Sequence, residues 1–254
     1  MKSKVNTIRM IGCLTAPLAA VMAATLTIGA SAVTARATLI DVNYEGNAIN
    51  TMTGAAILGS SGDIWNNLAN VPTSPTTLNQ VNGSSSGITL ITSSISGDFS
   101  DTGPDTTPNP AALMNGYIYG QSKTISFTVS GLAANSSFQL VVYGAGNDSG
   151  QGDIFSYSSA TGSWANGIST TSGTSRDIYT TGAEGINYVV FNGVTSTGSF
   201  TITATKNPTS ADPTNVYSVI NGFQLETPVP ESSALALLGS GGLALLLVGR
   251  RRRA

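Results

Sequence analysis

Short segments in which apolar and polar residues alternate recur between residues 38 and 227, and this pattern limits the fold more than any other feature of the chain. The segment Lys123–Ser130 is the clearest example, since its apolar residues Ile125, Phe127 and Val129 alternate with Thr and Ser. Successive side chains of a β-strand point to opposite faces, so a period of two indicates strands. No stretch of these residues sustains the 3.6-residue apolar spacing of an amphipathic helix. The sequence therefore predicts an all-β fold.

Gly, Asn, Ser and Pro bound the predicted strands and favour turns between them. About eight or nine short strands over about 190 residues fit one domain at 38–227, a two-sheet β-sandwich or jelly roll. Three long polar segments are expected to be loops: Val71–Gly87, Gly97–Pro110 and Gly144–Thr174. A short helix or turn is expected near Asp63–Asn70, with Asp63 as its cap. Strands are expected at Thr38–Tyr44, Gly87–Ser93, Lys123–Ser130, Ser137–Tyr143, Asn187–Asn192, Ser199–Thr205 and Val216–Leu225.

The first 37 residues have the pattern of an export signal. Lys2, Lys4 and Arg9 form a basic region, and an uncharged, mainly apolar stretch runs from Met10 to Ala30. The following Ala35–Ala37 fits the A-x-A pattern that signal peptidase accepts. We therefore interpret residues 1–37 as a signal peptide, with a first transmembrane helix as the alternative.

Acidic residues strongly outnumber basic ones in the expected domain. Between residues 38 and 228 only Lys123, Arg176 and Lys206 are basic, against twelve acidic residues. Phosphate binding requires clustered Lys and Arg, so nucleic acid is not an expected partner.

Histidine and cysteine, which often act as nucleophiles, general bases or metal ligands, are nearly absent from the chain. The chain has no histidine, and its single cysteine, Cys13, lies within the expected signal peptide. Mechanisms that need a Ser-His-Asp or Cys-His arrangement are thereby excluded, as are disulfides and thiolate metal ligands in the expected domain. No cofactor is expected.

The C-terminal residues combine three elements in a fixed order. Val229, Pro230 and Glu231 precede an apolar run, Ala234–Val248. As a helix this run measures roughly 22 Å, short for a hydrocarbon layer of about 30 Å. A basic cluster at its end would stay in the cytoplasm, leaving the domain outside. That cluster consists of Arg250, Arg251, Arg252 and Arg253.

These three elements resemble the PEP-CTERM sorting signal, which combines a Val-Pro-Glu-Pro-like motif, a short membrane segment and an Arg-rich terminus. The resemblance assigns residues 228–254 to a sorting tail with a short transmembrane helix, although Ser232 replaces the second proline of the motif. It implies processing by an exosortase, a membrane-embedded transpeptidase, and display at the cell surface or in extracellular polymer. A plain C-terminal membrane anchor is the alternative.

Part of the expected domain resembles galactose-binding-like sandwiches. The residues concerned are Phe127–Leu132, Phe138–Tyr143 and Ile220–Leu225. The resemblance implies a jelly-roll architecture and is compatible with glycan binding.

Aromatic and acidic residues in the polar segments are the candidate site residues. Trp164, Tyr157 and Phe155 would stack on sugar rings if their faces are exposed, while burial in the core is the alternative. Asp148 and Asp153 carry oxygen ligands that suit Ca²⁺, although solvated loop acids are the simpler interpretation. Trp65 is expected in the core.

The sequence thus predicts an exported surface or matrix protein, structural or adhesive and associated with exopolysaccharide. A dedicated carbohydrate-binding module is the alternative hypothesis. A glycoside hydrolase or lyase, using a carboxylate pair such as Asp148 and Asp153 or Asp177 and Glu184, is a weaker one. We do not expect an enzyme.

Overall fold

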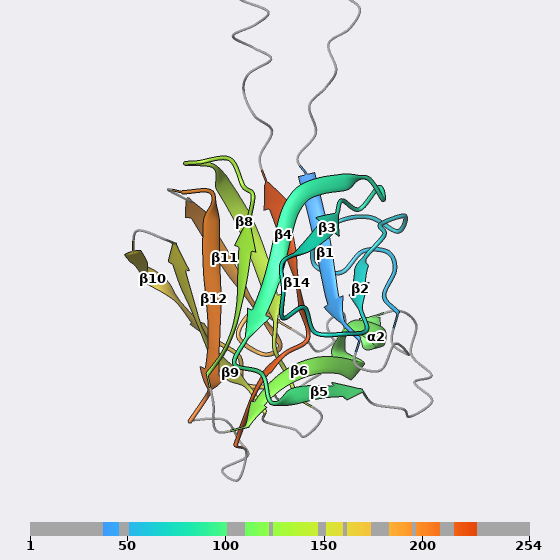
Figure 1. The fold of residues 1–254 in the computed structure, drawn as a ribbon. Helices are drawn as coiled ribbons and strands as arrows, with labels where there is room; N and C mark the ends of the chain where they lie inside the picture. The colour runs from blue at the N-terminus through green and yellow to red at the C-terminus, as the bar shows by residue number, and fades with distance from the viewer. Residues whose placement is uncertain are drawn as a thin grey trace, which may run out of the picture. The chain divides into compact units, whose positions relative to one another are not determined.

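Strands account for nearly all regular structure in the described residues, as the alternating pattern predicts (Figure 1). All of these residues fall in one compact unit of the chain, Arg36–Val229. Within them, no helix is long and apolar enough to cross a membrane. The expected signal peptide and sorting tail lie outside them. The computed structural model describes residues 38–45, 51–100, 110–121, 124–146, 151–159, 162–173, 183–194, 197–208 and 216–227.

A five-stranded sheet forms one layer of the fold, in the order β11-β8-β14-β1-β2. All its pairs are antiparallel except β1 with β2, which run parallel. Thr38 pairs with Thr227, so the first and last described residues lie side by side at one end of this sheet. Its strands are β1 (Thr38–Tyr44), β2 (Asn66–Leu68), β8 (Ser137–Tyr143), β11 (Tyr188–Val194) and β14 (Gly222–Thr227).

A six-stranded antiparallel sheet forms the second layer, in the order β10-β9-β12-β7-β4-β3. Its edge strand β10 contains a register shift between Ser163 and Ile168. The strands are β3 (Thr76–Asn79), β4 (Ser85–Ser93), β7 (Ile125–Ser130), β9 (Asp153–Ser159), β10 (Gly162–Thr170) and β12 (Ser199–Lys206).

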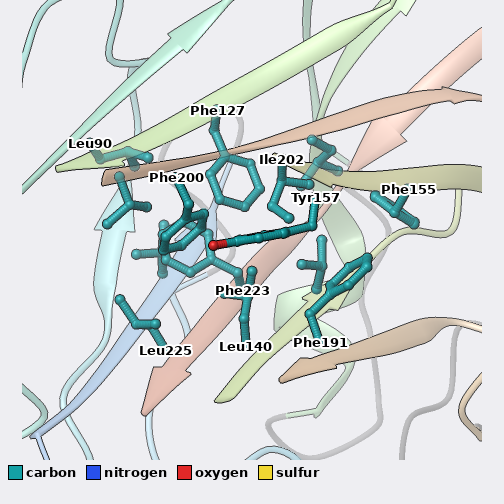
Figure 2. Packing of buried hydrophobic residues seen from close by; sticks show 14 of the residues in the cluster. Leu90, Phe127, Leu140, Phe155, Tyr157, Phe191, Phe200, Ile202, Phe223 and Leu225 are labelled. Atoms are coloured by element: carbon teal, nitrogen blue, oxygen red, sulfur yellow. The ribbon is translucent and has the colours of Figure 1, made fainter. Parts of the chain in front are cut away.

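Alternate residues of both sheets fill the space between them, as in a β-sandwich. The apolar residues of β7 and β12 expected to face inward are buried, which confirms those two predictions. Two aromatic pairs stack across the layers, each with ring centroids 4.6 Å apart: Phe127 with Phe223, both labelled in Figure 2, and Phe138 with Phe200. These contacts join β7 to β14 and β8 to β12.

A third sheet departs from the two-sheet prediction. It is a three-stranded antiparallel sheet, in the order β13-β6-β5, and it lies across one end of the sandwich (Figure 1). Strand β13 directly precedes β14, so this end is the one at Gly222, opposite to Thr227. Its strands are β5 (Gly97–Ser100), β6 (Gly116–Gln121) and β13 (Tyr217–Ile220), and the one described helix, α2 (Pro110–Asn115), leads into β6.

Other expectations were wrong in detail. The segment expected as one strand, Val216–Leu225, forms two strands in different sheets, separated by Asn221. The helix or turn expected near Asp63–Asn70 is replaced by strand β2, and the segments expected as loops contain β3, β5, β9 and β10. Most of these strands are short or polar, so their stability depends on neighbours that are distant in sequence.

A separate apolar layer covers the outer face of the five-stranded sheet. Met52 and Trp65 pack with Leu113 and Met114 of α2 against Val141 and Tyr143 of β8, as part of a buried cluster. The indole of Trp65 is 4% exposed, and its N–H donates to the carbonyl of Gly54 over 2.7 Å. The expectation that Trp65 is a core residue is thus confirmed.

The side chain of Gln224 in β14 fixes the backbone of Leu58 against the outer face of the five-stranded sheet. Its side-chain amide donates to Asp41 Oδ1 and to the Leu58 carbonyl, both over 3.0 Å. Its oxygen accepts from the Leu58 N–H over 2.9 Å and from the Tyr143 hydroxyl over 2.6 Å. The amide therefore uses both donors and both lone pairs in a buried position, which favours a single arrangement of this segment.

Asp41 lies next to Gln224 and is completely buried. Burial raises the pKa of its carboxyl to about 8; the Gln224 hydrogen bond opposes this shift, and the charge of Asp63 adds to it. Within the described residues Asp41 Oδ2 has no hydrogen-bond partner. The carboxyl is therefore largely protonated at neutral pH.

Truncating the cross-sheet aromatic contact should destabilise the domain strongly. We expect Phe127→Ala to lower the free energy of unfolding by about 3 to 5 kcal/mol, because it removes a stacked ring and leaves a cavity between the sheets. Thr203→Ala, on the outer face of the six-stranded sheet, is the control and should cost about 1 kcal/mol or less. Urea unfolding of both variants measures the difference, and equal losses would contradict the packing described.

The protonated state of Asp41 predicts a pH dependence of stability. The folded state keeps the proton up to a pKa of about 8, whereas the unfolded chain releases it near 3.8. Stability should therefore fall as pH rises from about 4 to 8. In Asp41→Asn the fall should be shallower, since Asn stays neutral throughout. Urea unfolding at pH 5 and pH 8 provides the comparison, and an unchanged slope in the variant would show that Asp41 is not the titrating group.

Candidate functional site

Four aromatic rings form a continuous row on the three-stranded sheet. We call Phe99, Tyr117, Tyr119 and Tyr217 the aromatic row. Phe99 stacks on Tyr117 with centroids 4.9 Å apart. Tyr119 meets Tyr117 edge-on at 6.5 Å and Tyr217 at 5.4 Å. The row thus crosses all three strands, from β5 through β6 to β13.

The strand register places these rings on one face. Phe99 pairs directly with Tyr117, and Tyr119 lies two residues further along β6, so the three side chains share a face. Tyr217 pairs with Gln121, two residues beyond Tyr119, and belongs to the same face. Phe99, Tyr119 and Tyr217 are half-buried, and Tyr117 is buried among them. Three ring systems therefore remain partly accessible to a ligand.

Gly97 makes room for one of these rings. It pairs with Tyr119, and a Cβ at Gly97 would lie only 2.8 Å from the Tyr119 hydroxyl oxygen. The phenol of Tyr119 therefore lies over the bare backbone of β5, an arrangement that a larger residue at Gly97 would disturb.

Asn221 joins the row's sheet to the sandwich. It is completely buried between β13 and β14. Its side-chain oxygen accepts from the Ala145 N–H over 2.8 Å, and its amide donates to the carbonyls of Met114 and Gly116 over 3.3 and 3.0 Å. Asn221 thus ties the end of β13 to the start of β6, which fixes the two strands that carry most of the row.

The chemistry around the row favours an uncharged ligand. Residues 38–228 carry three basic residues, Lys123, Arg176 and Lys206, against twelve acidic ones, so their net charge disfavours an anionic polymer. Aromatic faces bind apolar C–H surfaces, and the tyrosine hydroxyls add hydrogen-bonding capacity. A sugar ring combines both properties, with C–H groups on its faces and hydroxyls at its rim.

Two of the three aromatic residues expected to contact a glycan are core residues instead. Phe155 is completely buried and Tyr157 is 2% exposed. Figure 2 shows both side chains between the sheets, and the Tyr157 ring packs near Phe138 and Phe200, at 5.8 and 5.7 Å. The strand alternation of β9 turns them inward, so their faces are not available to a ligand. The third residue, Trp164, lies in β10, and its side chain is outside the described part of the structure.

Of the two acids considered for Ca²⁺, Asp153 is not a solvated loop acid. Asp153 opens β9, is completely buried, and accepts the Val219 N–H with both carboxyl oxygens. Burial raises the pKa of Asp153 well above its ordinary value, which favours the neutral form over a metal-binding carboxylate. Asp148 lies outside the described residues. Among the residues that are described, no three His, Cys, Asp or Glu side chains gather as metal ligands.

The residues assigned to the sorting tail also lie outside the described residues. This applies to Val229, Pro230 and Glu231 and to the arginine cluster. Their role stays a prediction from the sequence.

No family model matches the chain, and no curated protein sequence matches it significantly. Among solved structures it is similar to a family 35 carbohydrate-binding module from Clostridium thermocellum, with 12% identity over 60% of this chain and 97% of the module and a TM-score of 0.33. It is also similar to the CBM36-1 domain of a xylanase from the hindgut metagenome of Trinervitermes trinervoides, with 14% identity over 54% of this chain and 95% of that domain and a TM-score of 0.28. The plant receptor-like kinase ANX2 gives 11% identity over 56% of this chain but only 43% of the receptor chain, with a TM-score of 0.38.

Proposed function

We propose that this chain is an exported surface or extracellular-matrix protein, structural or adhesive, that associates with a neutral polysaccharide through the aromatic row. The observation that carries the proposal is the continuous contact of four rings across β5, β6 and β13, three of them partly exposed. We propose a binding role without catalysis, because a phenylalanine and three tyrosines suit stacking and hydrogen bonding to a ligand.

The row suits a sugar polymer better than a small ligand. It extends over three strands, so several sugar rings in one chain can each contact an aromatic face, and their contributions then add within a single molecule. Partly buried rings lose little side-chain freedom on binding, because their neighbours already fix them. The row thus favours recognition by shape and stacking, which tolerates some variation in the sugar.

Loss of a partly exposed ring should weaken binding to a neutral polysaccharide. We expect Tyr119→Ala and Tyr217→Ala each to reduce affinity at least about tenfold, the equivalent of about 1.4 kcal/mol, because each removes one stacking surface. Affinity gel electrophoresis of residues 38–227, expressed with the wild-type sequence and as variants, measures this with β-glucan, galactan and xylan as neutral probes. Alginate serves as the anionic probe.

Two controls separate binding from folding in this experiment. Tyr119→Phe keeps the ring and should retain most of the affinity. Tyr188→Ala removes a half-buried tyrosine on the outer face of the five-stranded sheet and should leave binding unchanged. Absence of retardation by every neutral probe would overturn the proposed function, and stronger retardation by alginate would overturn its restriction to uncharged polymers.

We further propose that signal peptidase and an exosortase process the two ends of the chain. The support is the sequence: an A-x-A site at Ala35–Ala37, and a tail in which Val229–Glu231 and the arginine cluster flank a short apolar run. In this proposal the precursor is held in the membrane by its tail and is then released to the cell surface or to extracellular polymer. A carbohydrate-binding module displayed by the same tail is the second candidate.

Processing can be tested by the location and mass of the native protein. In cells with an active exosortase we expect a product that lacks both ends, found at the surface or in the medium. In cells without it, the protein should stay in the membrane fraction with its tail attached. Replacing Pro230 and Glu231 by Ala should reproduce that retention in normal cells. The same mass and fraction in both strains would rule out exosortase sorting.

A further inference from the structure

A buried acid connects the sheet that carries the aromatic row to the sandwich. Asp153, the first residue of β9, is completely buried. The Val219 N–H of β13 lies 3.1 Å from each of its carboxyl oxygens. Asp153 belongs to the six-stranded sheet and Val219 to the three-stranded sheet, so this hydrogen bond crosses between two sheets.

The Asp153 carboxyl lies at the outer edge of β13. Among the described strands β13 is the end strand of the order β13-β6-β5 and pairs with β6 alone. The carbonyl of Tyr119, the residue opposite Val219, accepts from Ser96 on the far side of β6. The Val219 N–H therefore points away from β6, and the Asp153 carboxyl takes the place that a further strand would occupy.

Asp153 is itself held in place by a buried network. Its backbone N–H donates to Thr171 Oγ1 over 3.0 Å, and its carbonyl accepts from the Thr171 N–H over 2.9 Å. Thr171 Oγ1 donates in turn to the Gly144 carbonyl over 2.7 Å, and Asn207 donates to the Thr171 carbonyl over 3.0 Å. Each group has a partner, so the carboxyl has little freedom to move away from β13.

We propose that Asp153 is a positioning residue for the aromatic row: by holding the Val219 N–H it fixes strand β13 and thereby the ring of Tyr217 against Tyr119. Tyr217 lies two residues before Val219 on the same face of β13, and its ring contacts Tyr119 at 5.4 Å. Without this hydrogen bond β13 would be held less firmly, and the contact between these two rings would loosen. This inference rests on the proposed function for its effect on glycan binding, but its structural part is independent of that function.

Asparagine is the conservative replacement for the Asp153 carboxyl. Burial raises the pKa of Asp153 well above its ordinary value, which favours the neutral form of the carboxyl. Asparagine has nearly the same shape as a neutral carboxyl and keeps an oxygen acceptor for the Val219 N–H. Asp153→Asn should therefore preserve the position of β13, whereas Asp153→Ala removes the acceptor.

Hydrogen exchange at the Val219 amide tests the structural part directly. In Asp153→Ala we expect the Val219 amide of residues 38–227 to exchange at least about tenfold faster, because it loses the carboxyl that accepts its hydrogen bond. Amides of β7 and β14 should keep their rates. In Asp153→Asn the Val219 rate should stay within about threefold of the wild type. NMR exchange on the three proteins gives these rates residue by residue.

Affinity for the neutral polysaccharide probes should change in the same variant that loses Val219 protection. We expect Asp153→Ala to bind about tenfold more weakly and Asp153→Asn to bind like the wild type. Unchanged Val219 exchange in Asp153→Ala would overturn the inference. Faster Val219 exchange in Asp153→Asn would also overturn the inference. If Asp153→Ala does not fold, the exchange rate in Asp153→Asn tests the inference by itself. If the wild type binds no probe, the proposed function fails, and the exchange rates still decide whether Asp153 positions β13.

Discussion

Aromatic packing between the two large sheets is the interaction on which the rest of the structure depends. The pairs Phe127–Phe223 and Phe138–Phe200 join the layers, and no cysteine lies within the described residues to add a covalent link. Burial of apolar area therefore supplies most of the stability of the sandwich. The same demand turns Phe155 and Tyr157 inward. Phe99, Tyr119 and Tyr217 of the third sheet stay half-buried.

The strands that sequence patterning predicts well are those with one face in the core. In β7 and β12, alternating apolar residues correspond to alternating burial, and Thr38–Tyr44 and Ser137–Tyr143 form strands with the predicted bounds. Periodicity carries no such information for β2 or β3, whose few residues are largely polar. It also misses buried polar residues such as Gln224, because their burial depends on partners that the fold brings from distant segments.

The candidate site was beyond prediction for a related reason. Tyr117 and Tyr119 alternate in a segment of only six residues that begins with glycine, and nothing in that segment indicates that Phe99 and Tyr217 lie beside it. The apolar residues of Val216–Leu225 keep the same phase before and after Asn221, which favours one continuous strand. The change of sheet coincides with Asn221-Gly222, a dipeptide typical of turns. The structural role of Asn221 follows from the three backbone groups that its side chain binds, and the fold brings these groups to it from distant segments.

The pairing of Thr38 with Thr227 has a mechanical consequence. Under the proposed function, a tail that holds the chain beyond Thr227 would pull at one end of β14. A polymer bound to the row would pull at the other end, through β13 and Asn221. The load then runs lengthwise along β14, which is hydrogen-bonded to β1 on one side and to β8 on the other. Sliding β14 out requires both ladders to break together instead of one bond at a time. If the chain is adhesive, as proposed, this is the direction in which it would carry force.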